Sequence, residues 1–277
     1  MKSSIIQLGG LGNQMFIYAY YYAMKKRGYE VQIDASLYNL IKMHNGYELP
    51  AVFDIKPAEV ERKGLYLQWL RLLLHFKPHI LISEELFDRS MEKCVPNTPY
   101  ITGYWQSDIY FKEFRNDIKS LYRFKTIFTP NLSLSVKMQC EDSVSLHIRR
   151  GDYLDIPGAL NICSREYYIK AIEIIKQKVN NPHFYIFSND TVWSREFAEE
   201  LGINYAVVDH NIGVNSYQDM YLMTQCKHNI LANSSFSWWG AYLNVHDNAI
   251  RIAPKIWCQG HSEKTLETDT PVDWIRI

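Results

Sequence analysis

The sequence predicts an α/β protein with two domains, and three observations carry this prediction. Residues 4–33 read as a strand, a glycine turn, a helix and a second strand, which is a βαβ opening. From residue 144 to residue 253, short apolar strands alternate regularly with helical patterns. Between these parts, residues 125–142 turn polar around a proline and several serines, which is typical of a linker. We therefore expect an N-terminal α/β domain at 1–130 and a C-terminal domain at 131–277.

The N-terminal half begins clearly and then loses its regularity. We expect a strand at 4–8, a glycine turn at 9–12, a helix at 13–27 and a strand at 31–33. Residues 38–124 lack such clean alternation and contain aromatic-rich helical patterns, including 66–70 and 108–115. This stretch is expected to be α/β without sharp element boundaries.

The C-terminal half predicts five strands separated by helices. The strands are expected at 144–148, 183–187, 205–208, 229–232 and 249–253. The helices are expected at 164–179, 191–201, 217–226 and 236–243. Strands that alternate with helices in this way form a parallel, doubly wound sheet.

Composition narrows the class of protein. Thirty basic and thirty acidic residues cancel over 277 positions, so no overall field favours nucleic acid or an anionic membrane. Five cysteines, odd in number and without a Cys-x-x-Cys pair, argue against a disulfide framework and a zinc site. With no signal-peptide pattern at the N-terminus, we expect a cytoplasmic protein.

One segment leaves membrane contact open. Residues 65–76 are the most apolar stretch but fall well short of the roughly 20 residues that span a bilayer, and they include Arg71. A core helix is the favoured interpretation, with peripheral contact at the inner membrane face as the alternative.

Three polar clusters follow predicted strands of the C-terminal half, where ligands bind in open parallel sheets. The guanidinium group of an arginine can donate two parallel hydrogen bonds to phosphate oxygens, so the first cluster favours a diphosphate ligand. The alternative is an ion pair of Arg149 or Arg150 with Asp152. One polar cluster at a strand end could arise by chance, because turns are usually polar. Three clusters whose side chains suit phosphates and a base favour a nucleotide-binding site. The clusters are His147-Ile148-Arg149-Arg150, Ser188-Asn189-Asp190 and Asn233-Ser234-Ser235.

The second and third clusters each have a simpler alternative. Ser234 and Ser235 lead into a helix whose first-turn N–H groups and dipole favour an anion, but Ser234 could be an ordinary N-cap. Asn189 and Asp190 could recognise a purine or could cap the helix that begins at Thr191. Both pairs of interpretations stay open.

The N-terminal glycines permit a second enzyme hypothesis. Gly10-x-Gly12 with Asp34 about 20 residues later resembles a dinucleotide fingerprint, but Met15 occupies its third glycine position. Trp238 and Trp239 are expected in the core. The sequence contains no Asp-x-Asp pair to hold a divalent ion on a sugar diphosphate, so no metal and no resident cofactor are expected.

Four motifs together resemble the α-1,2-fucosyltransferases of glycosyltransferase family 11, over nearly the whole chain. The resemblance implies a bacterial protein of GT-B-like architecture, with two Rossmann-like domains facing each other across a cleft. It implies GDP-fucose as donor, bound by the C-terminal domain, and a terminal β-galactose as acceptor on the N-terminal side, with inversion and without a metal. The motifs are Gly9-Gly10-Leu11-Gly12-Asn13-Gln14-Met15-Phe16, His147-Ile148-Arg149-Arg150-Gly151-Asp152-Tyr153, Ser188-Asn189-Asp190 and Asn233-Ser234-Ser235-Phe236-Ser237-Trp238-Trp239.

The resemblance also suggests residue roles. Arg149 is expected to contact the β-phosphate, and Asn13 is expected near the leaving oxygen. Asp152 is predicted to be the general base that deprotonates the acceptor hydroxyl, with a salt bridge as its alternative role. The acceptor, an oligosaccharide or a lipid-linked glycan, cannot be read from the motifs. A non-catalytic sugar-nucleotide or glycan-binding module is the alternative function, and a dinucleotide-dependent enzyme ranks below it. Further donor contacts are expected from Gly10, Gly12, His147, Arg150, Asn189, Asp190, Ser234, Ser235 and Phe236.

Overall fold

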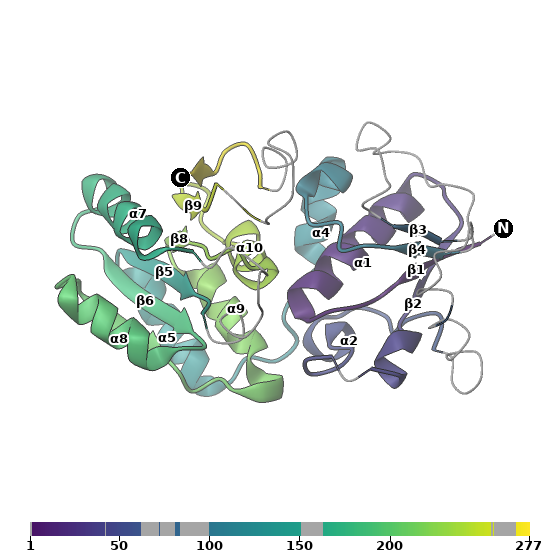
Figure 1. The fold of residues 1–277 in the computed structure, drawn as a ribbon, viewed down its shortest axis with the longest axis horizontal. Coiled ribbons are helices and arrows are strands. Elements are labelled where there is room, and N and C mark those ends of the chain that lie inside the picture. Colours follow the sequence, from purple (N-terminus) through teal and green to yellow (C-terminus); the bar gives the residue numbers. More distant parts are fainter. Residues whose placement is uncertain are drawn as a thin grey trace. The chain divides into compact units, whose positions relative to one another are not determined.

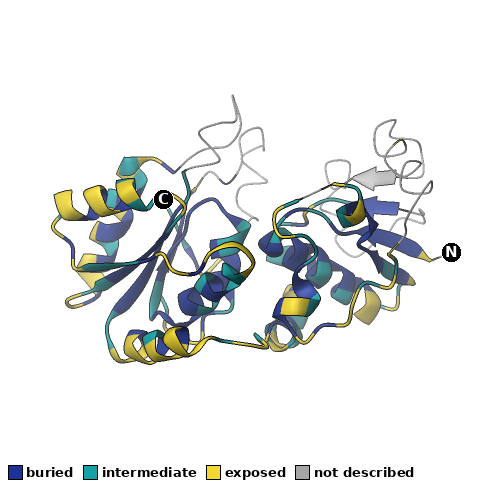
Figure 2. Ribbon diagram, turned by 90° about the horizontal axis from the view of Figure 1, so that it is seen from below, coloured by how far each residue is buried: buried dark blue, intermediate teal, exposed yellow. Residues whose placement is uncertain are grey.

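A computed structural model of the protein describes residues 2–41, 43–61, 72, 81–83, 100–150, 163–255, 257 and 270–277. The chain divides into two compact units, Met1–Lys125 and Thr126–Ile277, each built on its own parallel sheet (Figure 1). Figure 2 shows the strands of both sheets mainly in the colour of buried residues, with exposed residues on the outer surfaces of the helices.

The first unit contains a four-stranded sheet in the order β2-β1-β4-β3, with every described pairing parallel. Its strands are β1 (Ser3–Ile6), β2 (Val31–Asp34), β3 (Leu81–Ser83) and β4 (Tyr100–Thr102). Its α-helices are α1 (Leu11–Lys26), α2 (Leu49–Val52) and α4 (Arg115–Leu121), and its 3-10 helices are η1 (Ser36–Asn39), η4 (Asp108–Tyr110) and η5 (Lys112–Phe114).

The βαβ opening predicted from the sequence is confirmed, although its first strand ends at Ile6 instead of residue 8 and its helix is shifted. Helix α1 begins at Leu11 rather than Asn13, because Gly10 in extended conformation serves as its N-cap. Lys25 and Lys26 close its last turn, where positive charge complements the helix dipole. The predicted helical pattern at 108–115 becomes η4 and η5 before α4 begins, while the pattern at 66–70 lies outside the described residues.

The second unit contains a six-stranded sheet in the order β10-β9-β8-β5-β6-β7, again parallel throughout. Its strands are β5 (Ser143–Ile148), β6 (His183–Ser188), β7 (Tyr205–Val208), β8 (His228–Ile230), β9 (Arg251–Ala253) and β10 (Ile275–Arg276). Its helices are α5 (Thr129–Cys140), α7 (Arg165–Lys178), α8 (Thr191–Glu200), α9 (Tyr217–Gln225) and α10 (Ser235–Tyr242), with the 3-10 turn η6 (Gly213–Asn215). The five predicted strands are all present, and β10 was not predicted.

Strand β5 alternates apolar and polar residues, yet all six are buried. One face packs against residues of α7 and α8 through Val144, Leu146 and Ile148. On the other face, which residues of α5 and α9 help to cover, Ser145 Oγ accepts a hydrogen bond from Asn229 Nδ2 at 2.7 Å. Because helices cover both faces of a parallel sheet, a polar residue within it needs such an internal partner.

The predicted linker at 125–142 is wrong for most of its length, because Thr129–Cys140 forms helix α5. Pro130 lies in the first turn of this helix, where its missing N–H leaves no bond unmade. The hydroxyls of Ser133 and Ser135 donate to the carbonyls of Thr129 and Leu132, which satisfies them within the helix. Polar residues here therefore belong to a helix of the second unit and not to a flexible connection.

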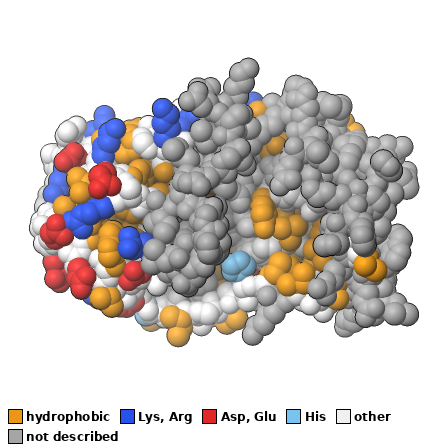
Figure 3. Space-filling view, viewed as in Figure 1, with side chains coloured by type: hydrophobic (Ala, Val, Ile, Leu, Met, Phe, Trp, Pro, Cys, Tyr) orange, Lys and Arg blue, Asp and Glu red, His pale blue; other side chains and the backbone are white. Residues whose placement is uncertain are grey.

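The described surface matches the balanced composition. On the face in Figure 3, acidic and basic side chains are interspersed over the second unit. No helix among the described residues is long and apolar enough to cross a bilayer. The apolar segment 65–76 lies outside the described residues except for Leu72, which is exposed.

A buried carboxyl predicts how the stability of the second unit depends on pH. Burial raises the pKa of Asp219 from 3.8 to about 7, with repulsion from Asp209 adding to the effect and a hydrogen bond from Asn211 Nδ2 opposing it. Between these two values the folded state holds more protons than the unfolded state, so stability falls as the pH rises through this window.

We therefore expect the melting temperature of the wild type to fall between about pH 4 and about pH 7. The Asp219→Asn variant, which keeps the shape and lacks the charge, should show a smaller fall. Thermal melting of both proteins across this range is the measurement, and an identical pH dependence would contradict the assignment to Asp219.

Candidate active site

The strand order of the second sheet identifies one edge as the place for a ligand. The chain passes from β5 to β6 and β7 on one side and then crosses over to β8 and β9 on the other side of β5. In doubly wound sheets, ligands bind outside the carboxyl ends of the strands at this switch point. The segments at this point are residues 149–150, after β5, and residues 231–235, after β8.

Arg150 is fixed to the neighbouring strand end. Its backbone N–H donates to Asn189 Oδ1 at 3.0 Å, and its guanidinium Nε lies 3.6 Å from Asp190 Oδ2. The same guanidinium lies 4.2 Å from the ring centre of Trp193, a cation–π contact that the sequence did not suggest. Arg149, half-buried, precedes it directly at the end of β5. The two arginines therefore bring positive charge to the switch point.

His147 is buried in β5 and contributes no positive charge. Burial, with Arg149 nearby, lowers the pKa of His147 to about 3, so the imidazole is neutral at ordinary pH. Its ring centre lies 6.2 Å from that of Phe236, which follows the β8 end. The side chain can therefore act at this edge through packing or as a neutral hydrogen-bonding group.

Asp190 is the N-cap of α8, which is the simpler of the two interpretations of the second cluster. Its Oδ1 accepts a hydrogen bond from the backbone N–H of Trp193 at 3.2 Å. Asn189 positions the Arg150 backbone through the bond given above. Both side chains therefore organise the arginine loop in this structure, and their contact with a purine remains a prediction.

Ser234 is likewise the N-cap of α10, with its hydroxyl accepting from the backbone N–H of Phe236 at 3.3 Å. Ser235 is the first residue of this helix, so the positive end of its dipole lies at the carboxyl edge beside β5. The helix is firmly held, because Trp238 and Trp239 are fully buried, as the sequence predicts. The third cluster therefore combines an ordinary cap with a geometry suited to an anion.

The first sheet has a switch point of its own, between β1 and β4. The loop after β1 begins with Gly9, whose φ of +77° favours glycine. A methyl group on its Cα would lie 2.7 Å from Asn13 Nδ2 and 3.2 Å from Tyr104 Cε1. The same addition at Gly10 would lie 3.1 Å from Cδ2 of His44. Asn13, His44 and Tyr104 therefore pack against two glycines, where a larger residue would not fit without displacing them.

Gln14 holds this loop in place, a role that was not predicted beyond its presence in the first motif. Its side-chain Nε2 donates to the carbonyls of Gly9 and Gly46 at 3.1 and 2.8 Å. Its Oε1 accepts from the backbone N–H of Glu48 at 2.8 Å. One buried amide thus joins the loop after β1 to the turn at residues 43–48.

Asn13 has an amide partner, since Gln106 Nε2 donates to its Oδ1 at 2.7 Å. Gly12 lies inside the first turn of α1 and is buried. Asp34, the acid of the dinucleotide hypothesis, is fully buried at the end of β2 and accepts from the backbone N–H of Ser36. Since a ribose-binding acid must reach its ligand, this burial disfavours the dinucleotide interpretation.

Asp152 lies outside the described residues, so its candidacy as base stays a prediction. Among the residues that the structure does describe, no group of three His, Cys, Asp or Glu side chains could hold a metal ion. Cys140, Cys163 and Cys226 are free thiols, and Cys163 Sγ donates to Asn233 Oδ1 at 3.7 Å.

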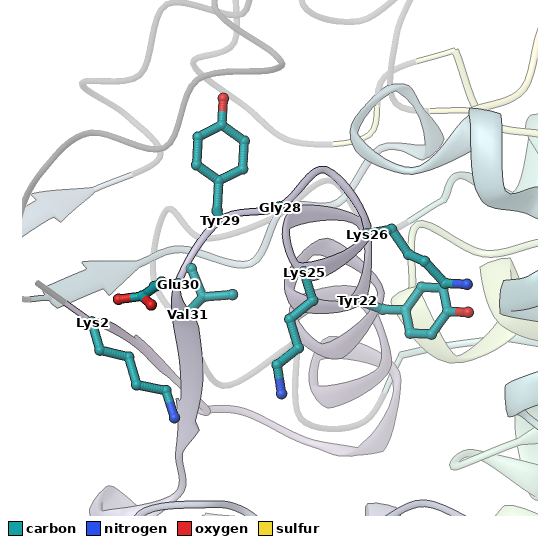
Figure 4. A pocket seen from close by; sticks show the side chains of 8 residues that line it. All are labelled: Lys2, Tyr22, Lys25, Lys26, Gly28, Tyr29, Glu30 and Val31. Atoms are coloured by element: carbon teal, nitrogen blue, oxygen red, sulfur yellow. The ribbon is translucent and has the colours of Figure 1, made fainter.

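A cavity of about 640 Å³ lies at the opposite edge of the first sheet, around the end of α1 and the amino ends of β1 and β2 (Figure 4). Its three lysines each have an acidic partner: Lys2 and Lys25 pair with Glu59, and Lys26 pairs with Asp117. Because these charges are compensated and the strand ends are the wrong ones, we do not place the active site there. The lining residues are Lys2, Tyr22, Lys25, Lys26, Gly28, Tyr29, Glu30 and Val31.

Two units, each with a parallel sheet and a polar loop at its switch point, make up an α/β architecture of the kind found in GT-B folds. The solved structure of fucosyltransferase NodZ from Bradyrhizobium shares this fold at a TM-score of 0.51 and 13% identity, covering 87% of this chain and 93% of that one. The model of Glycosyl transferase family 11 matches residues 2–277. The chain therefore belongs to glycosyltransferase family 11, as the motifs predicted.

Curated relatives agree with the family. An alpha-1,2-colitosyltransferase of Escherichia coli is 33% identical over 97% of this chain and 96% of its own length. A galactoside alpha-(1,2)-fucosyltransferase 2 of Hylobates lar is 24% identical over 88% of this chain and 69% of its own length. Both names specify transfer to form a 1,2-linkage, with different sugars.

Proposed function

We propose that this protein transfers L-fucose from GDP-fucose to the 2-hydroxyl of a terminal β-galactose, with inversion and without a metal ion. The observation that carries the proposal is the family match over residues 2–277, together with relatives named for 1,2-transfer of fucose or colitose. The structure supports a nucleotide-sugar donor through the arginine loop and the start of α10, which meet at one switch point.

The proposed chemistry uses these two features. As the bond between fucose and GDP breaks, negative charge grows on the β-phosphate. Arg149 would stabilise this charge with its fork, assisted by the dipole of α10 at Ser234 and Ser235. Arg150 is held by Asp190 and Trp193 and would position the loop. In the first unit, Asn13 would lie near the leaving oxygen.

GDP-colitose is the alternative donor, because one relative at 33% identity is a colitosyltransferase. Colitose is fucose without its 3-hydroxyl. A site that hydrogen-bonds this hydroxyl would reject the deoxy sugar strongly, whereas a site with an apolar group there would tolerate both. The ratio of kcat/KM for GDP-fucose and GDP-colitose therefore identifies the donor.

The first test is mass spectrometry of β-galactoside disaccharides incubated with each donor in EDTA. Addition of one deoxyhexose from GDP-fucose, with the 2-linkage confirmed by NMR, would support the reaction and its independence of metal, whereas addition of one dideoxyhexose from GDP-colitose alone would assign the other donor. Tight GDP binding without turnover across the acceptor panel would favour a non-catalytic binding module instead. Absence of GDP binding would overturn the proposed donor site.

The base that removes the proton of the acceptor hydroxyl is proposed to be Asp152. We expect Asp152→Asn to lower kcat by about 10²–10⁴-fold, because general base catalysis typically contributes this much. GDP affinity should stay close to that of the wild type. Near-normal turnover of this variant would assign Asp152 to a salt bridge and exclude it as the base.

A further inference from the structure

Two ring side chains of the first unit, His44 and Tyr104, have no part in the donor chemistry proposed above. They lie against successive glycines of the loop after β1: His44 contacts Gly10, and Tyr104 contacts Gly9. We call this group of four residues the glycine-loop cluster. It lies at the carboxyl ends of β1 and β4, the switch point of the first sheet.

The backbone around this cluster adopts unfavourable conformations at two residues that are not glycine. His44 has a φ of +45° and Trp105, next to Tyr104, has a φ of +53°. Left-handed backbone at such residues persists only where surrounding contacts impose it, and it is frequent at ligand sites. Both left-handed residues lie in or next to the segments that pack against the loop after β1.

The two residues differ in their surroundings. Trp105 is fully buried, with its ring stacked on Tyr20 at 4.0 Å and nearly parallel at 4°. With Trp105 held in the core, the preceding Tyr104 stays 42% exposed. His44 is exposed, on the turn that Gln14 joins to the loop. The fold thus holds two exposed rings against the glycine loop, in which Gly9 itself is buried.

This combination suits a sugar. An exposed tyrosine ring offers an apolar face for the C–H groups of a pyranose, and an imidazole offers hydrogen bonds to its hydroxyls. The two rings lie against consecutive residues, Gly9 and Gly10, whose Cα atoms are about 3.8 Å apart, so both rings belong to one short stretch of the loop. The polar groups of Asn13 and Gln106 lie next to Gly9 for further hydroxyl contacts.

The geometry points to the glycine-loop cluster as the subsite for the acceptor galactose, with Tyr104 stacking on the sugar and His44 binding its hydroxyls. This inference rests on the proposed function for the identity of the sugar, and it assigns acceptor residues that the motifs did not reveal. It also separates the work of the two units: the second binds the nucleotide, and the first binds the galactoside.

The test uses two variants chosen to preserve the backbone. Asn tolerates a left-handed φ, so His44→Asn keeps the turn while removing the imidazole. Tyr104→Ala removes the stacking face. Tyr29→Ala, at the opposite edge of the same sheet, is the matched control. Saturation-transfer NMR with N-acetyllactosamine and GDP measures acceptor binding without any reaction, and steady-state kinetics gives the acceptor KM.

We expect the acceptor KM to rise roughly tenfold in each cluster variant, with weaker saturation transfer to the galactose protons. The GDP dissociation constant, the KM of the donor and the melting temperature should match those of Tyr29→Ala. Wild-type acceptor binding in both cluster variants would overturn the inference, as would absence of saturation transfer to the disaccharide in the wild type. If the wild type binds the disaccharide and GDP but transfers no sugar, the proposed function fails while the NMR comparison still decides this subsite.

Discussion

Replacing Arg149 with alanine is expected to lower kcat by about 10²–10³-fold, the usual effect of removing one preorganised group that stabilises transition-state charge. Arg149 follows β5 at the switch point of the second sheet, and His147 beside it is neutral. Much of the positive charge available to a β-phosphate would therefore disappear. The measurement is GDP release at saturating donor and acceptor, alongside GDP affinity by calorimetry.

Two further variants make this result interpretable. Arg149→Lys keeps the charge and loses the bidentate fork, so its kcat should fall between those of the alanine variant and the wild type. Arg195→Ala removes an exposed arginine that pairs with Asp209 on the surface, and should behave like the wild type. All three should melt within a few degrees of the wild type, and unchanged turnover of Arg149→Ala would refute its role.

Replacing Trp238 with alanine is expected to destabilise the second unit by about 3–5 kcal/mol, as large aromatic truncations in cores do. Trp238 is fully buried, stacks on Tyr242 with ring centres 4.6 Å apart and meets Trp239 edge-on at 4.9 Å. For a unit of this size the melting temperature should fall by roughly 10 °C.

The functional consequence follows from the position of Trp238 in α10, one turn after the Ser234 cap. A helix that loses its anchor positions its first turn less firmly, so GDP binding should weaken as well. Phe128→Ala, which truncates an exposed aromatic of the same unit, is the control for stability. A change of only about 2 °C for Trp238→Ala would show that the helix is held by other contacts.

The strand-end clusters could be predicted because each depends on a local pattern. A buried strand followed by polar residues can be read without knowing its neighbours, and β5, β6 and β8 all follow this pattern. Their pairing places Ile148 opposite Ser188 and Leu146 opposite Ile230, which brings the clusters to one edge. The crossover that places β8 beside β5 was not predictable from alternation alone.

Other features depend on contacts between distant residues, which periodicity does not encode. Polar side chains at 129–140 suggested a linker, yet Asn131 Nδ2 donates to Asn211 Oδ1 and Gln218 Oε1 at 2.9 and 3.0 Å, so α5 is tied to residues far along the chain. The charge of His147 likewise depends on burial by residues outside its strand. His44 carries no motif, and only its contact with Gly10 reveals it.

The amide of Gln14 shows why the first motif requires glutamine and not merely a polar side chain of that length. Its nitrogen faces two carbonyl oxygens, and its oxygen faces one N–H. Glutamate has the same outline but would set one carboxylate oxygen against two carbonyl oxygens, and a buried charge with only one N–H donor is strongly disfavoured. Replacing the amide nitrogen of Gln14 with an oxygen would keep the shape of the side chain. It would turn the attraction to the carbonyls of Gly9 and Gly46 into a repulsion and leave only the bond to Glu48.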